Sequence, residues 1–300
     1  MRHKLNVGDL TIRRIGGLAV VSLLAWGLPV ASLARAPARI PGPIDAAAVL
    51  DAVYDQRQDG TWESVVPADA PTEAGQDLRG HKVEVRPLMS AHFLQHGSER
   101  FLVVTALIDP QNTCHGCSVL IGAALYVRDA GDTSWHPGPV AAALDLAGSF
   151  GSPPEVSFEQ LGPDSYGFGV RDKYHGTGET DDWLTLWRAA PKQFSKLLRV
   201  HLLLTEEQMS QPPASDCEVA RNDVRVLSGS RSGVFDLALH ISKGTLHTSG
   251  DAVDACELPL PRAADFKQME TVFHYDPATN RYCQAATFPG AEPQAPRCRH

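Results

Sequence analysis

The feature that most constrains the fold is a series of short apolar or alternating segments that begins at His81 and continues almost to the C-terminus. Turn residues separate these segments at spacings of about 10 to 14 residues, too short for the helical crossovers that parallel sheets need. Alternation with a period of two residues is typical of a strand with one buried face. The predicted strands lie within residues 81–94, 100–109, 119–129, 155–161, 166–172, 183–187, 197–204, 223–229, 233–242 and 271–284.

This pattern predicts a mainly β chain, an antiparallel meander that forms a sandwich, a barrel or a partial propeller. Glycine recurs beside aromatic residues in GSFGSPP (148–154) and GPDSYGFGV (162–170), but no fixed period establishes propeller blades. In the C-terminal hairpin, Asp276-Pro277 begins the turn and Asn280 is expected in the left-handed region.

Residues 43–60 carry the one clear helical pattern, with apolar residues at helical spacing behind Asp45 as N-cap and ahead of Gly60 as a stop. Residues 61–80 are rich in Pro, Gly, Asp and Ala and are interpreted as a linker. The predicted organisation is therefore a signal peptide (1–34), an N-terminal helix and linker (35–80), and a β-rich domain (81–300). Disulfides are expected to staple the part of that domain from about residue 206 onward.

The N-terminal 34 residues have the three-part layout of a secretory signal. Basic residues precede an apolar run from Ile15 to Val30, and Ser32 and Ala34 supply the small residues of a cleavage site after Ala34. The run is shorter than the roughly 20 residues that span a membrane. Two alternatives stay open, a twin-arginine signal and an uncleaved anchor. The basic residues are Arg2, Lys4, Arg13 and Arg14.

Removal of this segment takes away four basic residues and Asp9, which leaves 23 basic against 34 acidic residues and a formal charge of −11. A surface this acidic repels nucleic acid and anionic lipid, so neither is an expected partner. No further apolar stretch approaches membrane length, and the mature protein is expected without stable membrane insertion, in the periplasm or outside the cell.

Cys114-His115-Gly116-Cys117 is the motif with the widest range of chemistry. A c-type haem needs a histidine directly after the second cysteine, where Ser118 stands, and zinc needs further ligands at matching spacing. The preferred interpretation is a disulfide that closes a turn between two strands. The alternative is a thiol–disulfide enzyme in which Cys114 attacks, Cys117 resolves and His115 tunes the pair.

The segment after the motif separates these two hypotheses. Thioredoxin-like sites place the first cysteine at a helix N-terminus, which lowers the pKa of its thiol. Here Val119–Val127 looks like another strand, so that influence is not expected. The four remaining cysteines allow three pairings, and we favour Cys217 with Cys256 and Cys283 with Cys298. No cofactor is predicted.

Three weaker candidates concern metals and sugars. The loop at 174–182 gathers Glu179, Asp181 and Asp182 and is a weak candidate for calcium, although the EF-hand spacing is absent. His92 and His96 lie four residues apart without a third ligand in sequence. Trp183 and Trp187 are interpreted as core residues rather than a sugar-stacking platform, because large aromatic side chains usually fill β cores; the two tryptophans lie four apart in the WLTLW segment.

Residues 90–220 resemble a group of uncharacterised exported bacterial proteins that carry a Cys-His-x-Cys motif ahead of a glycine-aromatic stretch. The segments that carry the resemblance are TCHGCSVLIGAALYV, GSFGSPPEVSFEQLGPDSYGFGV and ASDCEVA. The resemblance implies a bacterial, exported setting and no particular chemistry.

The sequence thus predicts an exported, disulfide-stapled β protein with a binding or structural role, towards a ligand or protein partner that it does not name. It does not point to an enzyme: G-x-S-x-G, H-E-x-x-H and phosphate-binding glycine motifs are all missing. The alternatives are the periplasmic thiol–disulfide oxidoreductase and a calcium- or glycan-dependent binding module. The loops at 111–118 and 174–182 are expected to frame any functional surface.

Overall fold

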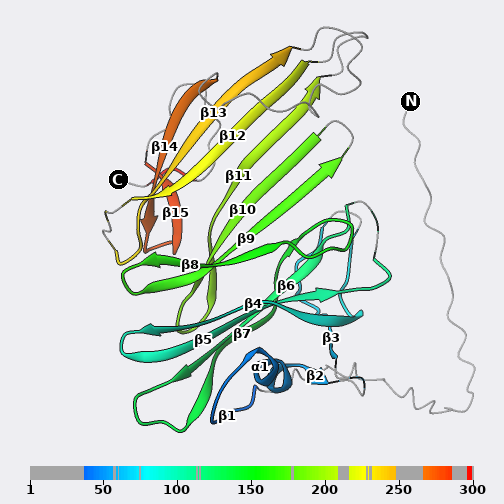
Figure 1. Ribbon diagram of the computed structural model, residues 1–300, viewed down its shortest axis with the longest axis vertical. Coiled ribbons are helices and arrows are strands. Elements are labelled where there is room, and N and C mark those ends of the chain that lie inside the picture. Colours follow the sequence, from blue (N-terminus) through cyan, green and yellow to red (C-terminus); the bar gives the residue numbers. More distant parts are fainter. Residues whose placement is uncertain are drawn as a thin grey trace, which may run out of the picture. The chain divides into compact units, whose positions relative to one another are not determined.

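Two antiparallel sheets contain nearly all the regular structure in the described part of the chain (Figure 1). The computed structural model describes residues 37–56, 59, 61–73, 76–112, 114, 116–176, 179–208, 216–227, 229, 232–247, 266–285 and 296–298, which lie within one unit, Ala34–His300. The predicted signal peptide at 1–34, His115 and Cys256 lie outside the described residues.

The first sheet has seven strands in the order β1-β7-β6-β5-β4-β3-β2. Its strands are β1 (Ile40–Pro41), β2 (Asp55–Gln56), β3 (Trp62–Val65), β4 (Lys82–Gln95), β5 (Ser98–Ile108), β6 (Val119–Arg128) and β7 (Ser134–Ala147). The second sheet has eight strands in simple sequence order. They are β8 (Glu155–Gly162), β9 (Ser165–Gly176), β10 (Glu179–Ala189), β11 (Phe194–Gln208), β12 (Asp216–Val226), β13 (Leu237–His247), β14 (Lys267–Asp276) and β15 (Arg281–Gln284).

The predicted antiparallel meander is confirmed. From β2 to β7 and from β8 to β15, each strand pairs with its neighbours in sequence, and every pairing is antiparallel. The result is two curved sheets, including a half-barrel, and not a ring of propeller blades. Short connections make this order the simplest one, because strands joined by tight turns pair directly.

The central strands of the first sheet are buried on both faces. Along β5, Phe101, Val103 and Leu107 point into one apolar cluster, here called the outer cluster. The alternate residues Leu102 and Val104 point into a second cluster on the opposite face, here called the inner cluster. Because successive side chains of a strand leave on opposite faces, two-sided burial requires the unbroken apolar run that this strand carries.

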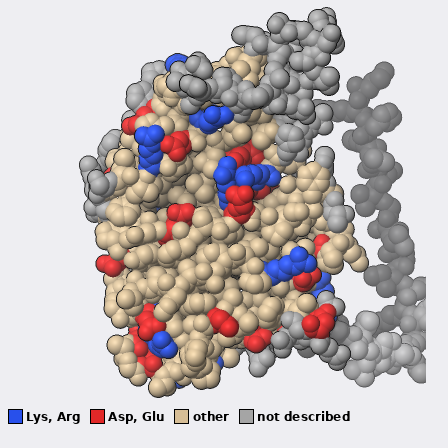
Figure 2. All heavy atoms as spheres, in the orientation of Figure 1, with Lys and Arg blue, Asp and Glu red and all other residues tan. Residues whose placement is uncertain are grey.

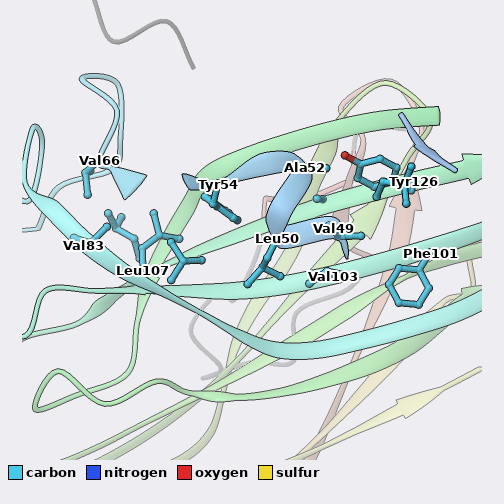
Figure 3. Packing of buried hydrophobic residues seen from close by; sticks show 14 of the residues in the cluster. Val49, Leu50, Ala52, Tyr54, Val66, Val83, Phe101, Val103, Leu107 and Tyr126 are labelled. Carbon is cyan, nitrogen blue, oxygen red and sulfur yellow. The ribbon is translucent and has the colours of Figure 1, made fainter. Parts of the chain in front are cut away.

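The outer cluster of the first sheet is covered by α1 (Ala46–Val53), the one α-helix among the described residues (Figure 3). Asp45 is its N-cap, as predicted, and accepts a hydrogen bond from the Ala48 N–H at 2.8 Å. Val49 and Leu50 face the sheet and are almost fully buried.

The predicted stop at Gly60 is wrong, because the helix ends at Val53. Tyr54 is extended, and its buried hydroxyl lies 3.1 Å from Thr105 Oγ1 of β5. Burial raises the Tyr54 pKa to about 12. This anchor turns the chain into β2, which pairs with β3, so tertiary contacts outweigh the helical propensity of the following residues.

The inner cluster joins the two sheets. Phe168 and Trp187 of the second sheet pack with apolar side chains of β5 and β6, and Phe168 is fully buried. The ring of Phe168 stacks on Trp187, with centroids 6.2 Å apart and planes inclined by 10°. Gln95 adds a polar link, because its Nε2 donates to the Asp164 carbonyl at 2.8 Å.

Two strands lie where the sequence pattern does not indicate them. β7 contains Pro137 and Pro139, residues that normally argue against a strand. Its pairing with β6 carries two register shifts, and β1 covers only its first two residues, so the prolines lie beside irregular pairing and along a largely open edge. β3 lies within the predicted linker 61–80 and extends the first sheet.

The C-terminal hairpin follows the predicted turn. Asn280 has φ of 54°, in the left-handed region, and its amide Nδ2 donates to Ser195 Oγ. The Asp276 carboxylate accepts from the Ala278 N–H at 2.9 Å, which closes the turn after β14.

On the face shown in Figure 2, lysine and arginine side chains lie beside aspartate and glutamate and do not gather into a separate basic patch. Ion pairs such as Arg171–Asp182 and Lys173–Glu155 likewise join opposite charges. The expectation that nucleic acid is not a partner stays a prediction.

Within the described residues, no helix has both the length and the apolar character needed to cross a bilayer.

We expect Phe168→Ala to lower the free energy of unfolding by about 3 to 5 kcal/mol, because it removes a fully buried ring between the sheets. Phe158→Ala is the matched control, since the Phe158 side chain is 37% exposed, and it should cost clearly less. Urea denaturation followed by tryptophan fluorescence measures both. Equal losses for the two variants would contradict the inter-sheet role of Phe168.

Candidate functional site

The Cys114–Cys117 motif forms a disulfide in the turn between β5 and β6, with Cα atoms 5.0 Å apart. The Cys117 N–H donates to the Cys114 carbonyl at 3.0 Å, and Cys117 is buried. The chain then continues into β6, as predicted, so no helix N-terminus is directed at the sulfur atoms. The main physical influence that lowers a thiol pKa in thioredoxin-like sites is therefore missing here.

The exit of this loop is fixed by an unusual side-chain pairing. Gln76 is buried, its Nε2 donates to the Ser118 carbonyl at 2.6 Å, and the Ser118 N–H donates to its Oε1 at 2.9 Å. The amide of Gln76 thereby replaces the backbone of a neighbouring strand. This contact was not visible in the sequence, because 42 residues separate the partners.

A tight turn at 148–152, here called the glycine turn, docks onto the disulfide loop. The Gly151 N–H donates to the Cys117 carbonyl at 2.8 Å. Gly148 has φ of 86°, and a Cβ placed on it would lie 2.0 Å from the Ser152 carbonyl oxygen, so only glycine fits. Phe150 also has a positive φ, of 55°, and its side chain is 43% exposed.

Asp172 of β9 lies beneath the glycine turn. Its Oδ1 accepts a hydrogen bond from the Gly148 N–H at 2.7 Å. Burial, together with the negative charges of Glu73 and Asp181, raises the pKa of the Asp172 carboxyl to about 6, against the opposing influence of the Gly148 N–H and Arg199. This residue was not among the sequence candidates, because its position opposite Trp183 is set by strand pairing and carries no local sequence signal.

The structure connects the two predicted loops through this carboxylate. Trp183 stands directly opposite Asp172 in the β9–β10 pairing. Asp181, two residues before Trp183, lies on the same face of β10. The disulfide loop, the glycine turn and the strand leaving the 174–182 loop are thus contiguous. The expectation that these loops frame a functional surface stays a prediction.

The calcium candidates do not converge. Asp181 and Asp182 are consecutive on β10, so their carboxylates leave on opposite faces of the sheet. Asp181 Oδ1 lies 2.9 Å from His201 Nε2, and Asp182 is buried and paired with Arg171. The side chain of Glu179 lies outside the described residues. Within the described part of the chain, no group of three or more His, Cys, Asp or Glu side chains is arranged to hold a metal ion.

The histidine pair is separated as well. His92 Nε2 lies 3.0 Å from the Glu99 carboxylate, on the strand body. His96 is in the hairpin turn after β4 with φ of 51°, and its imidazole lies 4.0 Å from Asp164. The two imidazoles therefore have different partners.

The two tryptophans of WLTLW share one face of β10, as expected. Trp187 is buried in the inner cluster. Trp183 is half-buried, with the His201 ring centroid at 3.3 Å and the Arg199 guanidinium 4.5 Å from its ring centroid. Its ring is thus engaged by protein groups, which does not favour the glycan-stacking alternative.

Among the C-terminal cysteines, the predicted pair Cys283–Cys298 is confirmed. The bridge holds residues 296–298 beside β15, where the Cys298 N–H donates to the Gln284 carbonyl at 3.1 Å. Cys217 is fully buried and disulfide-bonded, and Cys256, its predicted partner, lies outside the described residues. No described cysteine is free.

A cavity of about 190 Å³ opens on the face of the second sheet that points away from the inner cluster. We call it the hollow. Its walls come from β8, β10, β12, β13 and β15, and the segment after β12 closes one side. The lining residues are Glu159, Gln160, Leu161, Leu184, Leu186, Val224, Val226, Phe235, Leu237 and Tyr282.

Two hydrogen bonds hold the closing segment in place. The Phe235 N–H donates to the Leu161 carbonyl of β8 at 2.7 Å, and the Tyr282 hydroxyl donates to the Phe235 carbonyl at 2.7 Å. Burial raises the pKa of Tyr282 above its ordinary value, so the hydroxyl stays a donor at neutral pH. The hollow is therefore preformed by the fold.

Glycines in the YGFGV segment permit the hollow to form. A Cβ on Gly167 would lie 2.9 Å from Leu161 Cδ1, and a Cβ on Gly169 would lie 3.2 Å from Leu184 Cδ1 and 3.3 Å from Glu159 Oε1. The side chains of β8 and β10 thus extend over the bare backbone of β9. The glycine-aromatic pattern seen in the sequence has this packing as its cause.

The fold and the hollow define a disulfide-bonded, two-sheet antiparallel β protein with an apolar cavity on one sheet. In comparisons with known proteins, no family model, no curated protein and no solved structure matches the chain.

Ionisation of Asp172 should make stability depend on pH. Because the folded state raises its pKa from 3.8 to about 6, the folded state binds more protons in that interval. The free energy of unfolding should fall by about 2 kcal/mol between pH 4 and pH 6, after allowance for partial exposure, and then level off. Asp172→Asn keeps the acceptor for Gly148 and should remove this fall.

The control for this prediction is Asp69→Asn at an exposed aspartate, which should leave the pH profile unchanged. Urea denaturation at pH 4, 5, 6 and 7 measures all three proteins. A profile for Asp172→Asn that coincides with the wild type would contradict the assignment.

The disulfide geometry also makes a prediction about redox activity. Because β6 and not a helix follows Cys117, we expect no acceleration of insulin reduction by dithiothreitol above the uncatalysed rate. A turbidity assay with thioredoxin as positive control measures it. Turnover by the wild type that Cys114→Ser abolishes would instead support the oxidoreductase alternative.

Proposed function

We propose that this chain is an exported protein that binds a small apolar molecule in the hollow. The N-terminal signal-like segment and the disulfides support export, because disulfides persist in oxidising compartments. The cavity itself is the observation that carries the binding role.

The size of the hollow suits one ring or a short alkyl chain. Its volume is about 190 Å³, and an engineered apolar cavity of about 150 Å³ binds benzene. The hollow is smaller than the cavities that hold drug-sized ligands, which begin near about 300 Å³. A ligand of about seven or eight non-hydrogen atoms is therefore the expected class.

The lining favours an apolar ligand because several of its apolar side chains remain partly exposed to solvent. Leu186 and Leu237 are buried, but Leu184, Val224 and Phe235 are only partly so, and Val226 is 58% exposed. A ligand seated against them removes apolar surface from water, worth about 25 cal/mol per Å².

The alternatives have less support. The redox enzyme lacks a helix behind its motif, and the calcium carboxylates lie on opposite faces of β10. A purely structural role stays compatible with the disulfides, and the binding experiment below separates it from the proposed function.

We expect benzyl alcohol to bind wild-type protein with a Kd of about 0.1 mM, from about 0.7 kcal/mol for each of its non-hydrogen atoms. Leu184→Phe places a larger side chain in the hollow and should weaken binding at least about tenfold. Titration followed by the methyl NMR resonances of leucine measures both affinities.

Leu94→Phe is the matched control, since Leu94 is 64% exposed on β4 and does not line the hollow. It should bind benzyl alcohol like the wild type. If benzyl alcohol leaves the leucine methyl resonances of the hollow unchanged up to 10 times the expected Kd, the proposed function is wrong.

A further inference from the structure

We propose that the ligand of the hollow is an amine whose cationic head binds the carboxylate of Glu159 while its apolar body occupies the hollow. This inference rests on the proposed function and adds the chemical class of the ligand. Four observations about Glu159 and its surroundings carry it.

Glu159 lies at the wall of the hollow. Residues Glu159 and Leu161 are two apart on β8, so their side chains leave on the same face of the sheet. Glu159 Oε1 and Leu184 Cδ1 both lie within 3.3 Å of the point that a Cβ on Gly169 would occupy. The carboxylate thus borders the apolar lining directly.

The carboxylate is half-buried, and its contact in the fold is with a neutral group. Glu159 Oε1 accepts a hydrogen bond from Ser157 Oγ at 2.6 Å. Among the described residues, no lysine, arginine or histidine side chain makes an ion pair with it. A carboxylate next to an apolar wall, with lone pairs left for further donors, is suited to a cationic donor.

The neighbouring cations are engaged elsewhere. Lys173 pairs with Glu155 at 2.8 Å, and Arg171, on the same face of the sheet as Glu159, pairs with the buried Asp182. On the other side of the hollow, His274 Nδ1 lies 2.9 Å from Asp236, so that carboxylate already has a partner. Glu159 is therefore the acidic group of the hollow that a ligand can address.

The geometry also selects the kind of cation. The cavity has room for about one ring or a short alkyl chain beside the carboxylate, in keeping with its volume of about 190 Å³. A protonated primary amine supplies three N–H donors on a compact head. It needs less space than a planar guanidinium group. An anionic ligand of the same body would be repelled by Glu159.

Three probes of equal body and different head test the inference: benzylamine, benzyl alcohol and benzoate. We expect wild-type protein to bind benzylamine about tenfold more tightly than benzyl alcohol, and benzoate more weakly than either. In Glu159→Gln the preference for benzylamine over benzyl alcohol should fall to about onefold, with the affinity for benzyl alcohol unchanged. Methyl NMR titration gives all the affinities.

Glu155→Gln is the matched control, because it removes the same charge from the same strand at a residue that pairs with Lys173 and does not line the hollow. It should keep the tenfold preference. A second measurement needs no variant: in 1 M NaCl, where charges are screened beyond about 3 Å, the preference of the wild type should shrink while the affinity for benzyl alcohol does not.

The outcomes separate the two proposals. If benzyl alcohol binds in the hollow but benzylamine binds no more tightly, or if Glu155→Gln loses the preference as fully as Glu159→Gln, the amine inference is overturned and the apolar binding function stands. If none of the three probes binds, the proposed function fails and the amine inference fails with it.

Discussion

The two-sided burial of β5 and β6 is the constraint on which the rest of the structure depends. Alternate residues of these strands enter two separate apolar clusters, one beneath α1 and one shared with the second sheet. Because a strand shifted by one residue would exchange its two faces, the register of the central strands is set by both clusters at once. This fixed layer gives the second sheet a surface to pack on, and the other face of that sheet is then left to form the hollow.

The disulfides act at the borders of this framework and not within it. Cys114–Cys117 closes a turn that already has a backbone hydrogen bond, and a loop this short constrains the unfolded chain little, by about 2 kcal/mol. The Cys117 carbonyl in this turn accepts a hydrogen bond from the Gly151 N–H of the glycine turn, whose Gly148 N–H donates to the half-buried Asp172 carboxylate. Cys283–Cys298 spans 15 residues and ties the C-terminal segment beside β15, next to the wall of the hollow formed by Tyr282. One disulfide thus lies beside the glycine turn over Asp172, and the other lies beside the Tyr282 wall of the hollow.

Much of the fold could be predicted from the sequence, and the candidate site only in part. The period-two pattern predicted most strands, and Asp45 as N-cap predicted the start of α1. The β-branched and apolar residues after Cys117 predicted the strand that follows it. β7 was not, because its prolines contradict the pattern and only a bulged, partly open pairing accommodates them. The carboxylates at 181 and 182 were neighbours in sequence, yet the pleat of a strand sends them to opposite faces. Glu159 gave no signal at all, since a single glutamate in an alternating strand is ordinary.

The sequence by itself determined the antiparallel β class and the turn chemistry, because these depend on residue periodicity and on short-range geometry. It favoured the pairing of Cys283 with Cys298 among three, and the structure decided it. Only the tertiary structure decided where the hollow lies, which carboxylate borders it, and why Asp172 holds its proton to about pH 6. Those properties arise from groups far apart in the chain, such as the Gly148 N–H and the Asp172 carboxylate, 24 residues apart, and the side chains of Leu161 and Tyr282. Burial and the loss of solvent screening are consequences of packing between strands, and no local pattern records them.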